Sequence, residues 1–204
     1  MFKTIFSKMI AVFIIILVIA FSVTGFLLSF FLDDYFTKES SQLLEASSTE
    51  VYRVFTAYIE NINYTNSFSN IILESFLKNS LSALGNYTNS IIWIVDETGH
   101  IFLSNIEFSQ SIYEKYNDNG YIKIPDNKKF QRLAGEAGTE TDVGDYSGFF
   151  KDTMFARTGD LWLTVGRSFR YMDASGANEH MIIVYMHTPV KELKETRIAV
   201  FKYF

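Results

Sequence analysis

The residues that could support catalysis or hold a metal ion are few and lie far apart in the chain. The sequence has no cysteine, which excludes disulfides, thiolate nucleophiles and cysteine-bound metal sites. Its three histidines are His100, His180 and His187. Metal-binding histidines recur at close helical or turn spacing, and because these three lack that spacing we expect structural or solvated roles for them.

An acidic stretch offers a second candidate for chemistry. Glu136, Glu140, Asp142 and Asp145 are interspersed with glycines, which superficially suggests a calcium loop. The ordered ligand spacing of an EF-hand and its closing glutamate are both absent. A solvated, flexible loop is therefore the preferred interpretation.

The serines do not form a recognisable nucleophile. A nucleophile elbow has a glycine two residues on each side of the serine, and neither Ser147 nor Ser168 has this pattern. The sequence also has no glycine loop that would cradle a phosphate. We therefore predict no catalytic residue, no metal ligand and no cofactor, and we do not expect an enzyme.

The composition combines a very apolar segment with an ordinary soluble remainder. Hydrophobic residues make up 48% of the 204 residues and the net charge is −5. Lysines and arginines are scattered and form no basic stripe, so nucleic acid is not an expected partner.

A membrane anchor is predicted at residues 9–32. No charged residue occurs in this stretch, and about 20 apolar residues suffice to cross a bilayer. A cleaved signal peptide is the alternative, but its apolar core is only about 7–15 residues long. Lys3 and Lys8 precede the stretch and Asp33 follows it, so the positive-inside rule places residues 1–8 in the cytoplasm and the residues from Asp33 onward outside the cell.

Residues 33–85 are predicted to form two membrane-proximal helices with a break near residues 61–66. Apolar residues at helical spacing form a stripe on the first helix, which faces either the chain's own sheet or a second copy in a homodimer. They are Leu44, Val51, Phe55, Tyr58 and Ile62. The second helix, residues 68–84, places one set of apolar residues on one side, and Gly85 is expected as its left-handed C′ residue. That set is Phe68, Ile71, Ile72, Phe76 and Leu84.

Residues 86–188 are predicted to form an antiparallel sheet. A hairpin is expected from residues 91–95 and 100–103, followed by an irregular polar stretch at 108–121 and a short helix at 126–135. Three more strands are predicted at 148–157, 161–170 and 180–188, with connections at 158–160 and 173–178. The predicted fold is therefore α+β, with five antiparallel strands and flanking helices.

The C-terminal residues 189–204 are predicted to form an exit helix. Thr188 is expected as its N-cap and Pro189 as its first residue. Residues 197–204 fit either the start of a second membrane span or a plain amphipathic helix, because Lys202 counts against burial in lipid.

The order of these features resembles the extracellular Cache (PAS-like) sensor domains of bacterial membrane receptors, most closely those of Gram-positive sensor histidine kinases. The resemblance rests on the lysine-flanked first span with the aspartates that follow it, and on residues 94–99, 124–125, 163–168 and 187–190. Two features depart from the family pattern: residues 181–185 replace a glycine-rich strand, and this sequence has no second full span or cytoplasmic kinase modules. Any kinase activity would lie in such a part, absent from this chain.

The resemblance implies a ligand pocket between the central strands and residues 121–146. Aromatic side chains would pack a small solute there and an arginine or an aspartate would fix its charge. The candidate ligand-binding residues are Tyr146, Phe149, Arg157, Trp162, Arg167 and Tyr171. Each has an ordinary alternative role, as a core aromatic or an exposed charge on the sheet.

Two functions follow from this organisation. The first is an extracytoplasmic sensory module of a two-component receptor, which binds an unidentified small molecule or ion and relays the signal through its membrane-proximal helices. The second is a membrane-anchored accessory protein that binds another receptor without sensing a solute. In both, the lipid bilayer is a partner, and a homodimer through the membrane-proximal helix is expected.

Overall fold

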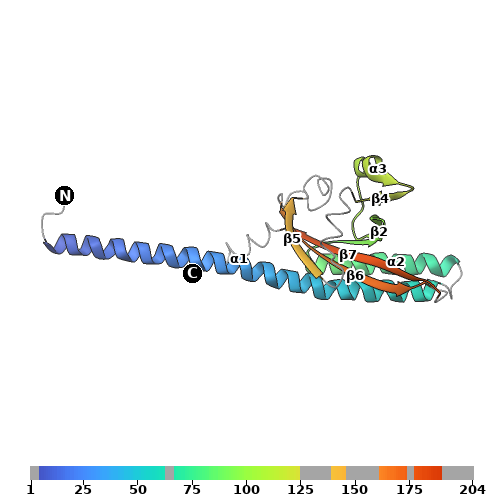
Figure 1. Cartoon of the computed structure of the whole chain (residues 1–204), viewed down its shortest axis with the longest axis horizontal. Helices are drawn as coiled ribbons and strands as arrows, with labels where there is room; N and C mark the ends of the chain where they lie inside the picture. The colour runs from blue at the N-terminus through green and yellow to red at the C-terminus, as the bar shows by residue number, and fades with distance from the viewer. Residues whose placement is uncertain (1–4, 63–66, 125–138, 146–160, 174–176, 190–204) are drawn as a thin grey trace.

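One 58-residue helix, α1 (Ile5–Ile62), extends from the N-terminal region to the far end of the folded domain (Figure 1). The computed structural model describes residues 5–62, 67–124, 139–145, 161–173 and 177–189. At a rise of 1.5 Å per residue, α1 is about 87 Å long. The predicted break after this helix is confirmed, because α2 (Ser67–Thr88) begins at Ser67.

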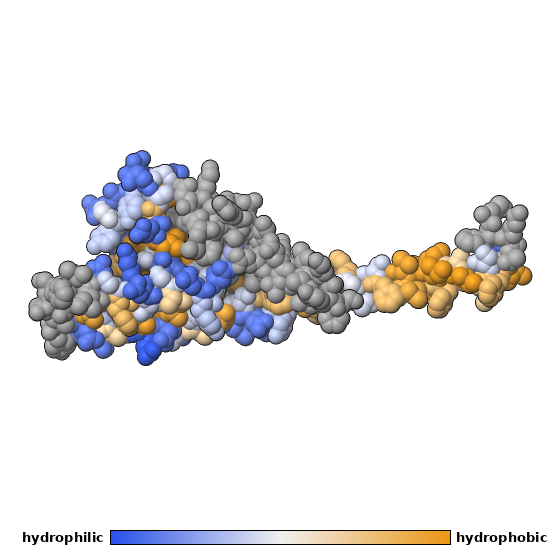
Figure 2. All heavy atoms as spheres, turned by 180° about the vertical axis from the view of Figure 1, so that it is seen from behind, coloured by the Kyte–Doolittle hydropathy of each residue, from blue (hydrophilic) through white to orange (hydrophobic). Residues whose placement is uncertain are grey.

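The first half of α1 exposes apolar side chains all round. Phe21 is 70% exposed and Phe26 is 74% exposed. Figure 2 shows this half as a hydrophobic rod that projects from a largely hydrophilic domain. The hydroxyl of Ser22 donates to the Val18 carbonyl oxygen at 2.8 Å, and that of Thr24 to the Ala20 carbonyl oxygen at 2.9 Å, so neither leaves a polar hydrogen facing outward. This helix is long and apolar enough to cross a membrane.

The second half of α1 packs on the domain through the predicted apolar stripe. Leu44, Val51 and Phe55 are buried, and Tyr58 is half-buried. Helix α2 lies beside this half and contributes Leu77 and Leu81 to the same core. Of the two orientations that the stripe allowed, the structure therefore shows packing against the chain's own sheet.

The predicted apolar side of α2 is only partly right. Phe76 is 63% exposed, whereas Leu77 and Leu81 are fully buried. Phe76 and Leu77 are adjacent, so their side chains point about 100° apart around the helix axis. The predicted side fails because Leu77, and not Phe76, lies in the core that α2 shares with α1 and the sheet. Leu84 is half-buried, and the side chains of Phe68, Ile71 and Ile72 lie outside what the structure describes.

Gly85 is not the C′ residue of α2, because the helix continues to Thr88 and Asn89 adopts the left-handed conformation with φ 49°. Gly85 is required for close packing. A Cβ atom there would lie 1.9 Å from Asn105 Nδ2 and 2.8 Å from the Ser90 carbonyl oxygen. The Asn105 amide accepts from Ile92 N at 2.8 Å and donates to Ser90 O at 3.0 Å, which ties the start of the sheet to the end of α2.

The sheet is antiparallel, with the strand order β3-β4-β2-β1-β7-β6-β5. Its strands are β1 (Ile91–Asp96), β2 (His100–Ser104), β3 (Asn117–Asp118), β4 (Tyr121–Lys123), β5 (Thr139–Asp145), β6 (Leu161–Met172) and β7 (Glu179–Pro189). The mixed α+β class and the β1–β2 hairpin are confirmed. The predicted number of five strands is too low, because the described part of the chain already contains six strands of three or more residues, and β3 adds a two-residue pair.

Three local predictions are corrected. The stretch expected to be irregular, 108–121, contains helix α3 (Gln110–Tyr116), capped by Ser109, and most of the β3–β4 hairpin. Glu140, Asp142 and Asp145 of the expected acidic loop lie in the strand β5, which pairs with β6, whereas Glu136 lies outside the described residues. Pro189 is not the first residue of a helix and Thr188 is not its N-cap: both lie in β7, where Pro189 pairs with Trp162, and the Thr188 hydroxyl donates to the Asn89 carbonyl oxygen at 2.9 Å. The elements predicted at 126–135, 148–157 and 158–160 and the exit helix from residue 190 lie outside the described residues.

The sheet separates two apolar cores because alternate residues of a strand point to opposite faces. Helices α1 and α2 cover one face, over Ile92, Leu163 and Val184. The other face carries Trp93, Trp162 and Tyr185, together with Ile112 of α3. The long helices therefore contact one side of β6 and β7 only.

We predict that Gly85→Ala destabilises the fold. The added methyl group meets backbone and the Asn105 side chain, neither of which can move without breaking the bonds that hold β1, so a loss of about 1–3 kcal/mol is expected. Thermal unfolding of the full chain in detergent micelles measures it. Gly25→Ala is the matched control, because a Cβ there meets nothing within 4 Å, and an equal loss in both variants would contradict the account.

Candidate functional site: a groove beside the sheet edge

A groove of about 540 Å³ lies where α2, β2, α3 and the β3–β4 hairpin meet. Helix α2 supplies its polar wall through Glu74, Lys78, Asn79 and Ser82, which lie along one side of the helix over about two turns. Residues 101–108 supply the opposite wall, and Tyr113, Gly120, Tyr121 and Ile122 supply the rim. Its volume falls within the range that small-molecule sites occupy.

The groove is lined by aromatic side chains and carries a small excess of negative charge. Glu74 and Glu107 contribute negative charge against one positive charge on Lys78. Phe102, Phe108, Tyr113 and Tyr121 contribute ring faces and edges. Carboxylates beside aromatic rings favour a ligand that carries an ammonium or similar cationic group.

The β3–β4 hairpin is built on a tight turn. Asn119 and Gly120 both have positive φ, 55° and 91°, which is the combination that a two-residue type I′ turn requires. The Asn117 side chain accepts from Gly120 N at 2.9 Å and closes the turn. The Asn-Gly pair is a strong hairpin signal, and it could have located this element from the sequence.

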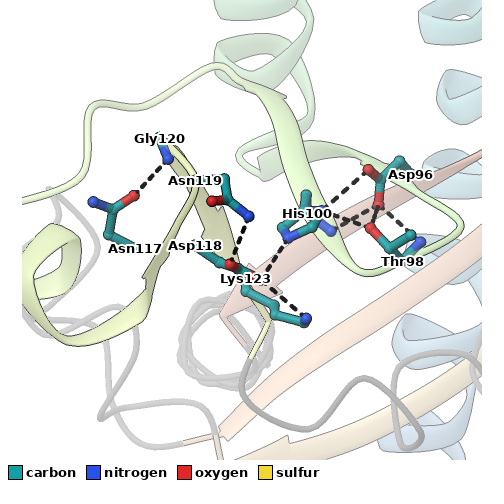
Figure 3. A network of polar contacts seen from close by, with 8 residues as sticks. All are labelled: Asp96, Thr98, His100, Asn117, Asp118, Asn119, Gly120 and Lys123. Carbon is teal, nitrogen blue, oxygen red and sulfur yellow. Dashed lines mark hydrogen bonds and ion pairs between the residues drawn. The ribbon is translucent and has the colours of Figure 1, made fainter.

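Figure 3 shows how His100 joins this hairpin to the β1–β2 turn. Its Nε2 lies 3.0 Å from Asp118 Oδ2 in β3, and its Nδ1 lies 2.5 Å from Thr98 Oγ1 and 3.3 Å from Asp96 Oδ2. Lys123 Nζ donates to the same Asp118 oxygen at 3.1 Å. The prediction of a structural or solvated role fits this position, but the sequence reasoning missed the two carboxylates that face the ring.

Asp96 organises the β1–β2 turn. Its Oδ1 accepts from Thr98 N at 2.9 Å, from the Thr98 hydroxyl at 2.7 Å and from His100 N at 2.9 Å. Partial burial would raise the pKa of Asp96, but these hydrogen bonds outweigh it and lower the pKa below its ordinary value. Hydrogen bonds from His100 and then Lys123 lower the pKa of Asp118. Both carboxylates therefore stabilise the fold at neutral pH and lose that contribution as acid protonates them, below about pH 4.

Thr98, His100 and Asp118 stand in the order hydroxyl, imidazole, carboxylate that is found in a catalytic triad. The Thr98 hydroxyl, however, is also within 2.7 Å of the Asp96 carboxylate, which competes for its proton. None of the three is among the described residues that line the groove. The arrangement is therefore suited to holding two turns together rather than to attacking a bound substrate.

A second histidine, His187, is buried in the core opposite the long helices. Its ring centroid lies 4.2 Å from that of Trp93, and its Nδ1 lies 2.9 Å from Thr164 Oγ1. Burial lowers the pKa of His187 to about 3, because the cationic form cannot be solvated there. His187 therefore stays neutral at physiological pH.

The three predicted ligand-binding residues that the structure describes do not lie together on one face of the sheet. Trp162 is buried on the face that carries Trp93, whereas Arg167 and Tyr171 lie at odd positions of β6 and face α1. Successive residues of a strand point to opposite faces of the sheet, so Trp162 cannot share a face with Arg167 and Tyr171. None of the three lines the groove. Tyr146, Phe149 and Arg157 lie outside the described residues.

Arg167 and its neighbours instead connect β6 to α1. An Arg167 guanidinium nitrogen donates to Thr49 Oγ1 at 2.7 Å, and Tyr52 stacks on Phe169 with ring centroids 4.4 Å apart. The Tyr52 hydroxyl also donates to the Arg170 carbonyl oxygen at 2.7 Å. Tyr171 contacts Phe55 edge-on at 5.4 Å.

Neither the scan against protein-family models nor the search of the curated proteins finds a match for this chain. Among the described residues, no three histidine, aspartate or glutamate side chains are placed to hold a metal ion.

We predict that His187 makes the fold acid-sensitive. Its pKa is lower in the folded chain than the ordinary 6.5, so unfolding takes up a proton, and stability should fall by about 1.4 kcal/mol per pH unit below pH 6.5. Urea unfolding at pH 7 and pH 5 should show a loss of about 2 kcal/mol in wild type relative to His187→Asn. His180→Gln is the control, because His180 is exposed. Equal pH dependence in wild type and His187→Asn would refute the prediction.

Proposed function

We propose that this chain is the extracytoplasmic sensory module of a membrane receptor, anchored by the first half of α1 and signalling through its second half. The observation that carries the proposal is the continuity of α1. The helix that is apolar enough to span a bilayer is the same helix that packs on the sheet through Leu44, Val51 and Phe55. A displacement of the sheet is therefore transmitted to the membrane segment without an intervening loop.

The contacts between β6 and α1 support such transmission. The Arg167–Thr49 hydrogen bond, the Tyr52–Phe169 stack and the Tyr52–Arg170 bond span about one turn of α1. Aromatic stacking and paired hydrogen bonds have preferred geometries, so they resist sliding more than aliphatic contacts do. Movement of β6 is expected to move this turn of α1 with it.

We propose the groove as the sensing site, with a small organic cation or zwitterion as its ligand. The acidic and aromatic lining supports this class. A ligand can shift the helices only by the difference in its affinity for the two arrangements of the domain, so a tenfold difference supplies about 1.4 kcal/mol. The groove is suited to such a difference because separate elements form it: α2 supplies one wall, residues 101–108 supply the other, and the β3–β4 hairpin supplies part of the rim.

The resemblance to Cache (PAS-like) domains is compatible with this proposal. The antiparallel sheet with two long helices on one face agrees with the architecture that the resemblance implies. A homodimer through α1 would use its exposed side, which carries Leu43, because Leu44 and Val51 are already buried. The accessory-protein alternative shares the anchor and differs in needing no ligand.

The proposed topology predicts which end of α1 is accessible from outside the cell. The chain has no cysteine, so Ser7→Cys and Lys38→Cys each introduce a single labelling site. In intact cells a membrane-impermeant maleimide should label Lys38→Cys and leave Ser7→Cys unlabelled until the cells are lysed. The reverse pattern would show that the domain faces the cytoplasm.

The proposed site predicts that filling the groove abolishes ligand stabilisation. Ser82 lines the groove from α2, whereas the next residue, Ala83, is exposed and is not among the lining residues. A thermal-shift screen of the full chain in nanodiscs should find stabilising amino acids or polyamines, with an effect lost in Ser82→Tyr and kept in Ala83→Tyr. A hit that persists in Ser82→Tyr would place the site elsewhere, and a screen without any hit would favour the accessory-protein alternative.

A further inference from the structure

The C-terminal end of α2 lies at the end of the domain that is nearest to the apolar half of α1. Only residues 63–66 connect α1 to α2, so α2 runs back along α1 in the antiparallel direction (Figure 1). At a rise of 1.5 Å per residue, Tyr87 is about level with residues 41–43 of α1. This level is about 15 Å beyond Leu32, the last residue of the uncharged stretch.

This end of α2 combines an exposed tyrosine with a long uncharged segment. The Tyr87 side chain is 77% exposed, the largest value for any large hydrophobic residue that the structure describes after Leu32. From Asn79 to Val95 the sequence has no aspartate, glutamate, lysine or arginine. Tyrosine has an apolar ring and a polar hydroxyl, which suits a membrane interface. The absence of charge around it removes the largest cost of an approach to lipid.

The apolar half of α1 is longer than a perpendicular crossing requires. The uncharged stretch from Met9 to Leu32 is about 36 Å long as a helix, whereas the hydrocarbon core of a bilayer is about 30 Å thick. A tilt of about 30° matches the two lengths, and interfacial aromatic residues help to set the direction of such a tilt. Any tilt of α1 is also a tilt of the domain, because the helix continues without interruption into it.

The arrangement of the domain favours a tilt toward α2. Helix α2 contacts β1, whereas α1 contacts β6 and β7, and β5 follows β6 in the sheet. Strand β5 and α2 therefore lie on opposite sides of α1. Because β5 contains Glu140, Asp142 and Asp145, a tilt that lowers α2 toward the bilayer also moves these acidic residues away from it.

We propose that Tyr87 forms a second membrane contact: α1 crosses the bilayer tilted toward α2, and the Tyr87 side chain lies in the lipid headgroup layer. A tilt of about 30° lowers α2 by about 5 Å relative to α1, because the axes of packed helices are about 8–10 Å apart. The Tyr87 ring then reaches the headgroup layer, which extends about 5–8 Å beyond the hydrocarbon core. The contact rests on the membrane anchor of the proposed function and is independent of any ligand in the groove.

Quenching by lipid headgroups tests this contact in the full chain. The chain has no cysteine, so Asn86→Cys allows one nitrobenzoxadiazole fluorophore to be attached beside Tyr87. Ser75→Cys is the matched control, because Ser75 is also exposed and lies on the same side of α2, about 16 Å farther from the membrane. In dioleoylphosphatidylcholine nanodiscs, lipids with a nitroxide on the headgroup should quench most of the fluorescence at residue 86 and little at residue 75.

Two second-site changes show whether the tyrosine holds the domain in this position. In the Asn86→Cys background, Tyr87→Ser should remove most of the quenching. Phe76→Ser should leave it unchanged, because Phe76 is an exposed aromatic residue of α2 that lies farther from the membrane. Equal quenching at residues 75 and 86, or quenching at residue 86 that Tyr87→Ser does not reduce, would overturn the proposal.

A fluorophore attached at Tyr35→Cys separates this proposal from the anchor on which it rests. Tyr35 is 59% exposed and follows the uncharged stretch directly on α1, so the anchor alone predicts quenching there. Quenching at residue 35 without quenching at residue 86 would refute the Tyr87 contact and leave the anchor intact. The absence of quenching at both positions would refute the membrane anchor as well.

Discussion

The burial of one apolar stripe on α1 is the constraint on which the rest of the structure depends. The stripe holds Leu44, Val51 and Phe55 against Leu163, Val165 and Val184 of the sheet. Each such side chain contributes roughly 1.5–3 kcal/mol when it is fully buried. Because these residues continue a helix whose first half is exposed and apolar, the same packing that stabilises the domain also fixes its position relative to that apolar half.

The two apolar cores, one on each face of the sheet, have different roles. The face under α1 and α2 also carries the polar and aromatic contacts from Arg167, Phe169 and Tyr171 that join β6 to α1. The opposite face holds Trp93, Trp162 and His187 in a closed interior. The groove lies between these layers at the edge of β2, where it contacts α2 as well as the β3–β4 hairpin. A ligand there can act on both the helical layer and the sheet edge.

Elements with a strong period were predictable from the sequence, and those that depend on tertiary packing were not. The heptad-spaced stripe of α1 and the run of β-branched residues in β1 indicated their elements correctly. The buried side of α2 was misjudged because Phe76 and Leu77 fit the helical period almost equally, and only the position of the sheet decides between them. The sequence pattern predicted Gly85 as the end of α2, but its role is to let Asn105 approach the helix backbone.

The candidate site was less predictable than the fold. Trp162, Arg167 and Tyr171 are close in sequence, but the strand places Trp162 on one face and the other two on the opposite face. The groove residues come from α2, β2 and the β3–β4 hairpin, and no local pattern connects these segments. The Asn119-Gly120 turn was the one strong local signal in the region, and it could have placed Asp118 near β2. The pairing of His100 with Asp118 required the tertiary structure.

The central claim is that α1 is a single rigid helix from the membrane segment to the sheet. Spin labels on Phe30→Cys and Glu60→Cys lie on exposed positions 30 residues apart, which corresponds to about 45 Å along a continuous helix. Pulsed electron–electron double resonance of the full chain in nanodiscs should give one narrow distance distribution centred near that value. A broad distribution, or one centred at a much shorter distance, would show that the helix breaks between the bilayer and the domain, and the proposed transmission would then be wrong.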